Sequence, residues 1–144
     1  VREECEKLFT RFGITTEYYD PLIGEKLRTL MKPNTKVVYL ESPGSQTMEI
    51  QDVPLLAKIA HEGGAIAMID NTWSGGHFFK AFGHGCDVSV QAATKYIIGH
   101  SDAMFSCVTC NEATWPQFKS IYETMGLFAG PDDMYLADPS RSIA

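Results

Sequence analysis

The sequence has no long apolar run, little positive charge and few cysteines. None of its apolar runs approaches the roughly 20 residues that a membrane-spanning helix needs, so we expect no membrane partner. Lys and Arg number 12 against 18 Asp and Glu, which gives a net charge of −6. Because nucleic-acid surfaces are normally basic, we expect no nucleic-acid partner. Glycine-rich phosphate fingerprints of the Rossmann or P-loop type are also absent, which argues against a nucleotide enzyme.

The four cysteines do not make an obvious metal or disulfide pattern. Cys107 and Cys110 have the spacing of a redox pair or of half a zinc site, but neither a second cysteine pair nor a histidine pair completes it. Residues 103–109 around them resemble a buried strand, so we expect these cysteines to pack and expect no metal. The N-terminus lacks a secretion signal, and free thiols in the cytoplasm are therefore predicted.

Apolar spacing predicts strands and helices in alternation. Strands are expected over residues 15–19, 36–41, 65–70, 87–92 and 103–109, and helices over 1–12, 23–31, 53–62 and 115–125. Asp52 is expected to cap the third helix, with Pro54 in its first turn. This order predicts an α/β fold with a mainly parallel sheet flanked by helices, in one domain.

Lys95 and Asp70 are the two residues that suggest chemistry. Lys95 follows the strand expected over 87–92 in a mostly apolar setting, where burial favours a neutral, nucleophilic amine. Asp70 ends the strand expected over 65–70. The pair suits pyridoxal 5′-phosphate (PLP), whose aldehyde bonds to a lysine and whose ring nitrogen pairs with a carboxylate. A buried lysine–carboxylate pair in an ordinary α/β core is the alternative.

Three motifs carry a resemblance to a known family. The run from Asp87 to Ser101, with its Ala-Thr-Lys-Tyr core and the following Gly-His-Ser, resembles the cofactor-attachment signature of the Cys/Met-metabolism PLP enzymes. The stretch 41–45 (Glu-Ser-Pro-Gly-Ser) resembles their Glu-Ser-Pro loop. Residues 68–73 (Met-Ile-Asp-Asn-Thr-Trp) resemble their aspartate strand. The three occur in the family's order.

The resemblance implies a site and a place in a larger protein. Lys95 would be the catalytic and cofactor-binding lysine, Asp70 the partner of the ring nitrogen, and Thr94 a ligand of the cofactor phosphate. From the residues alone, Thr94 is as well explained by strand packing. Relatives often carry a phosphate-binding Ser where this chain has Ala92, so other residues must supply part of the hydrogen bonding to the cofactor phosphate.

Residues 1–144 would form the central part of a fold-type-I large domain. The N-terminal segment and the C-terminal small domain of relatives, which assemble as homotetramers, would lie outside it. The likeness weakens after residue 135, so no function is assigned to Arg141.

Two positions bear on the reaction. Ser45, where many γ-specific relatives carry Asn, and Trp73 resemble the bacterial cystathionine β-lyases within the family. The resemblance therefore implies β-elimination of an amino-acid thioether substrate in methionine biosynthesis. A γ-lyase or γ-synthase of the same family is the nearest alternative. A non-catalytic fragment that serves only as a scaffold or subunit interface is the alternative from another class.

Overall fold

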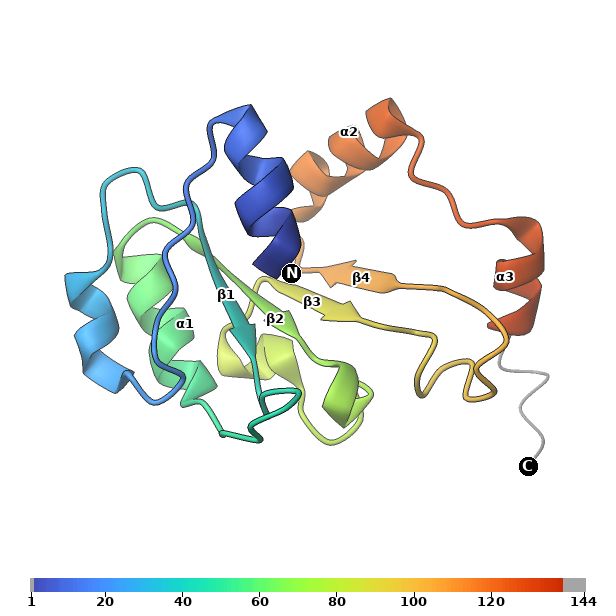
Figure 1. Ribbon diagram of the computed structural model, residues 1–144, viewed down its shortest axis with the longest axis horizontal. Helices are drawn as coiled ribbons and strands as arrows, with labels where there is room; N and C mark the ends of the chain where they lie inside the picture. Colours follow the sequence, from blue (N-terminus) through green and yellow to red (C-terminus); the bar gives the residue numbers. More distant parts are fainter. Residues whose placement is uncertain (1, 139–144) are drawn as a thin grey trace.

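A computed structural model describes residues 2–138, and its centre is a four-stranded sheet (Figure 1). The strands are β1 (Val37–Glu41), β2 (Ile66–Asp70), β3 (Val88–Gln91) and β4 (Cys107–Cys110), in that order across the sheet. The first three are parallel, and β4 runs antiparallel to β3. The predicted α/β fold with a mainly parallel sheet is confirmed.

Helices connect and flank the strands. In the described residues they are η1 (Glu4–Leu8), η2 (Phe9–Phe12), η3 (Gly24–Thr29), α1 (Val53–Glu62), η4 (Thr72–Ser74), η5 (Ala81–His84), α2 (Trp115–Met125) and α3 (Pro131–Leu136). The helical segment formed by η1 and η2 ends at Gly13, which has a left-handed backbone with a φ of 73° that glycine adopts easily. The Asp52 side chain accepts a hydrogen bond from Leu55 N at 3.2 Å, so the predicted N-cap of α1 is confirmed. In the described part of the chain, no helix is long and apolar enough to cross a bilayer.

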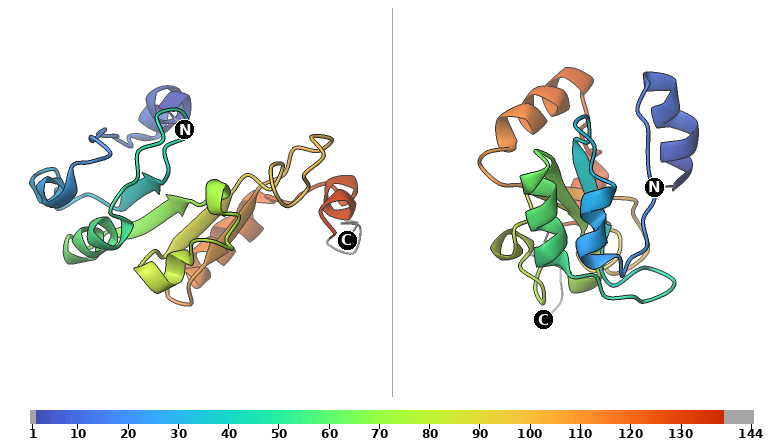
Figure 2. Two further views of the ribbon diagram at one scale, coloured as in Figure 1. Left: turned by 90° about the horizontal axis from the view of Figure 1, so that it is seen from below. Right: turned by 90° about the vertical axis from the view of Figure 1, so that its left-hand side faces the viewer.

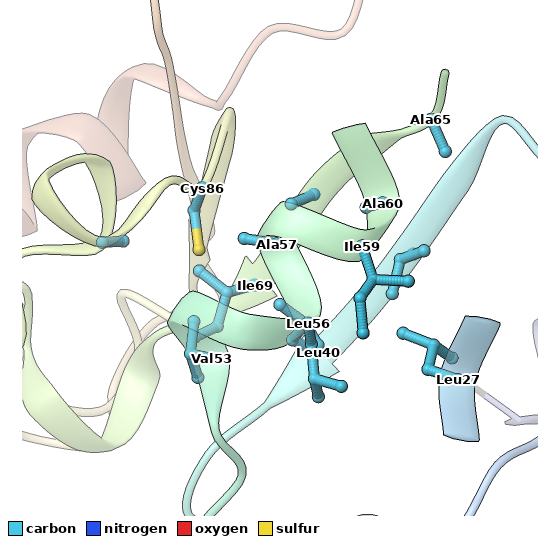
Figure 3. Close-up of a cluster of buried hydrophobic side chains, with 13 residues drawn as sticks. Leu27, Leu40, Val53, Leu56, Ala57, Ile59, Ala60, Ala65, Ile69 and Cys86 are labelled. Atoms are coloured by element: carbon cyan, nitrogen blue, oxygen red, sulfur yellow. The ribbon is translucent and has the colours of Figure 1, made fainter. Parts of the chain in front are cut away.

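The main core lies between α1 and one face of the sheet (Figure 3). Leu40 of β1 and Ile69 of β2 are fully buried there, against Leu56 and Ile59 of α1. Leu27 of η3 closes the side of this cluster. Burial of each large apolar side chain contributes about 1.5–3 kcal/mol, which fixes α1 on β1 and β2 and sets the strand register.

The opposite face of the sheet is only half covered, and it carries Asp70. Because side chains alternate along a strand, Tyr39, Met68 and Asp70 point away from the α1 core. The N-terminal helical segment, formed by η1 and η2, lies on this side of the sheet, opposite α1 (Figure 2, left view). Tyr19 OH donates a 2.8 Å hydrogen bond to Tyr39 O, and burial raises the pKa of Tyr19 to about 12. Burial first, and then the Asp70 carboxylate, raises the pKa of Tyr39.

Two expectations about the strands were wrong. Residues 15–19 form no strand in the described structure. The last strand begins at Cys107 rather than at residue 103, and Val108 and Thr109 on it are exposed. These residues favour a β-strand, but β4 lies at the edge of the sheet, where one side of the strand has no neighbour among residues 2–138. They are therefore exposed. The helix expected over 115–125 is confirmed as α2. On this helix Ile121, Tyr122 and Met125 are exposed, whereas Phe118 is half-buried.

Candidate active site

Three loops that follow the three parallel strands meet at one edge of the sheet. The loops begin after β1, β2 and β3, at the carboxyl ends of the strands, where ligands of open α/β sheets bind (Figure 1). Together they line a pocket of about 520 Å³. Its lining residues are Ser45, Thr72, Trp73, Thr94, Lys95, Tyr96 and Ser101. The structure thus brings Lys95 and Thr94 together with Ser45 and Trp73, two positions singled out from the sequence.

Lys95 lies four residues beyond the end of β3, in a turn rather than on the strand. Its backbone N–H donates to Ala92 O at 2.9 Å, and Ile98 N donates to Ala93 O at 2.9 Å, which fixes the turn. The expectation of a buried, apolar setting was wrong for the lysine side chain, which is exposed. Tyr96 and Ile97 beside it are also exposed, so this part of the pocket is open. Within residues 2–138, the Lys95 amine has no hydrogen-bond or ion-pair partner.

Thr94 closes the loop that carries Lys95. Its hydroxyl accepts from Phe105 N at 2.9 Å and donates to Phe105 O at 3.2 Å, while its backbone N–H also donates to Phe105 O at 3.1 Å. A hydroxyl has a single proton, so bonding a phosphate oxygen would require that proton to leave Phe105 O. The role of Thr94 as a phosphate ligand therefore stays a prediction.

Asp70 ends β2 beside the pocket, directly across from Glu41 of β1 and Val90 of β3. Its Oδ1 accepts two hydrogen bonds from Thr72, one from the backbone N at 2.9 Å and one from Oγ1 at 2.6 Å. Its Oδ2 has no hydrogen-bond or ion-pair partner within residues 2–138. The half-buried carboxylate is therefore held by one oxygen and keeps the other available for a proton donor.

Two neighbours of Asp70 were missed as site residues by the sequence reasoning. Asn71 is a buried polar residue whose Nδ2 donates to Phe79 O at 3.1 Å, and whose Oδ1 accepts from Ser74 Oγ at 2.7 Å. Thr72 both bonds Asp70 and lines the pocket. The available signal was an Asp followed two residues later by Thr at a strand end, a pattern typical of a side-chain-capped turn.

The loop after β1 places Ser45 at the pocket rim. This loop is closed by hydrogen bonds from Gly44 N to Glu49 O and from Gln51 N to Ser42 Oγ, both 3.0 Å. Trp73 lines the Lys95 pocket and also a second, mostly apolar pocket of about 330 Å³, which Pro43 and Phe78 help to line. Trp73 is therefore shared by the lysine-containing pocket and an apolar one.

The pocket residues fit PLP. The cofactor requires an amine that can bond its aldehyde, a carboxylate for its ring nitrogen and donors for its phosphate. Lys95 supplies an amine on the pocket wall that has no partner within residues 2–138. Asp70 does not itself line the pocket, but it bonds the lining residue Thr72, and its Oδ2 has no partner within the same residues. Ser45 and Ser101, whose side chains carry hydroxyls, also line this space. A volume of about 520 Å³ lies within the usual range of roughly 300–1,000 Å³ for small-molecule sites.

Possible metal sites and paired thiols are also absent within residues 2–138. Groups of three or more His, Cys, Asp or Glu side chains that could hold a metal ion are absent there. Cys107 and Cys110 are free, partly exposed thiols on β4. Residues three apart on a strand point to opposite faces, so these two thiols do not face each other. Arg141 lies outside the described residues.

Comparison with known proteins agrees with this geometry. Residues 2–138 match the family model described as Cys/Met metabolism PLP-dependent enzyme. The chain is 47% identical over 134 residues to the cystathionine β-lyase of Escherichia coli, covering 92% of this chain and 34% of that protein. It is 31% identical over 131 residues to the cystathionine γ-lyase of Bacillus subtilis, covering 90% of this chain and 35% of that protein.

The fold is shared with a solved structure of the same group. The crystal structure of the cystathionine γ-lyase of Lactobacillus plantarum, complexed with L-serine, matches with a TM-score of 0.89 and 25% identity. That match covers 94% of this chain and 36% of the other. The chain thus spans about a third of the length of these relatives. The matched motifs, the parallel sheet and the Lys95 pocket lead to one conclusion: the chain belongs to the Cys/Met-metabolism family of PLP-dependent enzymes.

Proposed function

We propose that this chain is the central part of the PLP-binding large domain of a cystathionine β-lyase. The reaction would convert cystathionine and water to homocysteine, pyruvate and ammonia. The observation that carries the proposal is the pocket at the carboxyl ends of the strands, which joins Lys95 to loops following all three parallel strands. The segments before and after this chain would complete the site and the small domain.

Each chemical residue has a distinct task in this proposal. When bound, PLP supplies an electron sink that stabilises negative charge on the substrate Cα. Lys95 Nζ would hold the cofactor by its aldehyde and, once freed by the substrate amine, would take the Cα proton. Asp70 Oδ2, which is not used by Thr72, would accept the hydrogen bond of the ring nitrogen and keep that nitrogen protonated. The thiolate would leave from Cβ as homocysteine, and water would convert the remaining three-carbon fragment to pyruvate and ammonia.

Support for β- over γ-elimination comes from the relatives and from two pocket residues. The cystathionine β-lyase of Haemophilus influenzae is 46% identical to this chain, whereas the L-methionine γ-lyase of Fusobacterium nucleatum is 35% identical. Ser45 and Trp73, which resemble the β-lyases, both line the Lys95 pocket. A γ-lyase or γ-synthase is the second candidate, because the cystathionine γ-lyase of Bacillus subtilis is 31% identical to this chain and that of Lactobacillus plantarum shares its fold.

The experiment is a product assay on the full-length protein that contains this chain. Supplied with PLP and cystathionine, it should release pyruvate and homocysteine. Mostly 2-oxobutyrate and cysteine would move the assignment to a γ-lyase. No keto acid from cystathionine, with PLP bound, would point to a γ-synthase. Absence of both PLP binding and turnover would favour the non-catalytic scaffold.

The assembly and location of the full-length protein are part of the same proposal. We propose a cytoplasmic homotetramer, by resemblance to the family. Support comes from the large apolar side chains on the surface of residues 2–138, among them Phe78, Met104 and Phe128. Exposed apolar side chains of this size often mark surfaces that another chain or segment covers. Light scattering on the full-length protein would measure its oligomeric state.

A further inference from the structure

Thr72 links the two residues to which the proposed function assigns chemistry. On one side its hydroxyl donates to Asp70 Oδ1 at 2.6 Å. On the other side the same hydroxyl oxygen accepts from Ala92 N at 2.8 Å. Ala92 O in turn accepts the 2.9 Å hydrogen bond from Lys95 N. A single hydroxyl therefore connects the Asp70 carboxylate to the start of the turn that holds the lysine.

The direction of these hydrogen bonds is fixed by chemistry. A backbone N–H can only donate, so Ala92 must occupy a lone pair of Thr72 Oγ1. The one proton of the hydroxyl is then free to point at the carboxylate, which accepts. The backbone N–H of Thr72 donates to the same Asp70 oxygen at 2.9 Å. Both donors thus occupy Oδ1, which holds the carboxylate in one orientation and leaves Oδ2 without a partner within residues 2–138.

We propose that Thr72 is a positioning residue whose hydroxyl sets the Asp70 carboxylate relative to the Lys95 turn, so that PLP can engage both at once. The proposal rests on the function proposed above. Thr72 also lines the pocket, so its effect is exerted where the cofactor would lie. Small errors in such an arrangement are costly, because displacement by about 1 Å can change a rate roughly a hundredfold.

The test compares Thr72→Val with Thr72→Ser in the full-length protein. Valine keeps the shape of threonine and removes the hydroxyl, whereas serine keeps the hydroxyl and removes a methyl group. PLP affinity is measured by titration of the visible absorbance, and cofactor orientation by circular dichroism in the same band. A hydrogen bond to a charged group corresponds to roughly a tenfold effect or more on a binding constant. We therefore expect PLP to bind the valine variant at least about tenfold more weakly, and the serine variant within about twofold of wild type.

Repeating the comparison in an Asp70→Ala variant distinguishes a positioning role of Thr72 from a general structural role. In Asp70→Ala there is no carboxylate to orient, so adding Thr72→Val should change PLP affinity little, measured up to millimolar PLP. Equal losses in both backgrounds would mean that Thr72 acts independently of Asp70, and would overturn the proposal. Unchanged PLP affinity and circular dichroism in the single valine variant would also overturn it.

Three further outcomes are distinguishable. If the valine variant does not fold, Thr72→Ala is compared with Thr72→Ser by the same titration; a smaller loss in serine than in alanine supports the proposal, and equal losses overturn it. If the wild-type protein itself does not bind PLP, the proposed function fails together with this inference. If wild type binds PLP and the variants do not differ, only the role of Thr72 is refuted.

Discussion

Asp87 joins three segments to the amino-terminal end of β3, whereas Lys95 follows the carboxyl end of that strand. Its Oδ2 accepts from Ala67 N of β2 at 2.8 Å and lies 2.8 Å from His61 Nε2 of α1. Its Oδ1 accepts from Asn111 Nδ2 at 2.8 Å, in the turn between β4 and α2. Thr114 Oγ1 also donates to the Asp87 backbone carbonyl at 3.3 Å. We predict that Asp87→Ala strongly destabilises the fold.

The size of the effect follows from the burial of each partner. Ala67 is fully buried, and leaving its N–H without a partner costs about 1–3 kcal/mol. The hydrogen bond from half-buried Asn111 adds about 1 kcal/mol. The His61 ring is 46% exposed, so its pair with Asp87 contributes at most about 1 kcal/mol. Together, Asp87→Ala should lower the free energy of unfolding by about 3 kcal/mol.

Urea unfolding of the full-length protein, followed by far-ultraviolet circular dichroism, measures this loss. His61→Ala is the matched control, because it removes only the exposed partner, and it should cost less than about 1 kcal/mol. Asp87→Asn keeps one acceptor oxygen for Ala67 N and should fall between the two. A loss in Asp87→Ala no larger than that in His61→Ala would show that the carboxylate does not hold these segments together.

Three further predictions concern the site, a buried thiol and the isolated chain. Asp70→Asn should still bind PLP but lower kcat by roughly a hundredfold or more at saturating PLP, because a neutral amide supplies no fixed charge beside the ring nitrogen. An unchanged kcat would make Asp70 a structural residue only. Burial, and then the charge of Asp87, raises the pKa of the Cys86 thiol to about 11 from 9.0, so the folded state favours the protonated thiol. The free energy of unfolding should be unaffected by this group below pH 9 and should fall between pH 9 and about 11, and Cys86→Ala should show a smaller fall; equal falls in both proteins would exclude the thiol as the cause. Residues 1–144 alone should aggregate in light scattering and give no pyruvate, because apolar side chains such as Met104 and Phe128 are exposed; a soluble monomer with the activity of the full-length protein would contradict this.

Local sequence patterns predicted much of the fold because the responsible interactions are local. The apolar runs of β1 and β2, the Asp52 cap of α1 and the apolar spacing of α2 need only neighbouring residues to be recognised. Residues 15–19 contain strand-favouring side chains, yet a strand also needs a partner strand, and that is a long-range property. The expected burial of the last strand failed for the same reason, since β4 lies at the edge of the sheet in the described residues.

The candidate site was only partly predictable. The motifs indicated that Asp70 and Lys95 stand at or just after the ends of two strands, and the parallel pairing of β2 with β3 places those ends at one edge of the sheet. The exposure of Lys95 could not be inferred, because it depends on which segments cover a turn that lies beyond the strand. The hydroxyls of Thr72 and Thr94 each bond a backbone group more than ten residues away, Ala92 and Phe105 respectively. Such hydrogen bonds depend on tertiary packing, and no periodic pattern in the sequence predicts them.

The central claim, that Lys95 is the residue to which PLP bonds, has one direct measurement. The full-length protein is mixed with PLP, reduced with borohydride to make the lysine–cofactor bond permanent, digested and mapped by mass spectrometry. We predict a pyridoxyl group on the peptide that contains Lys95, and its loss in Lys95→Ala without transfer to the exposed lysines Lys80 and Lys119. Equal labelling of several lysines, or labelling that persists in Lys95→Ala at the level of wild type, would contradict the account.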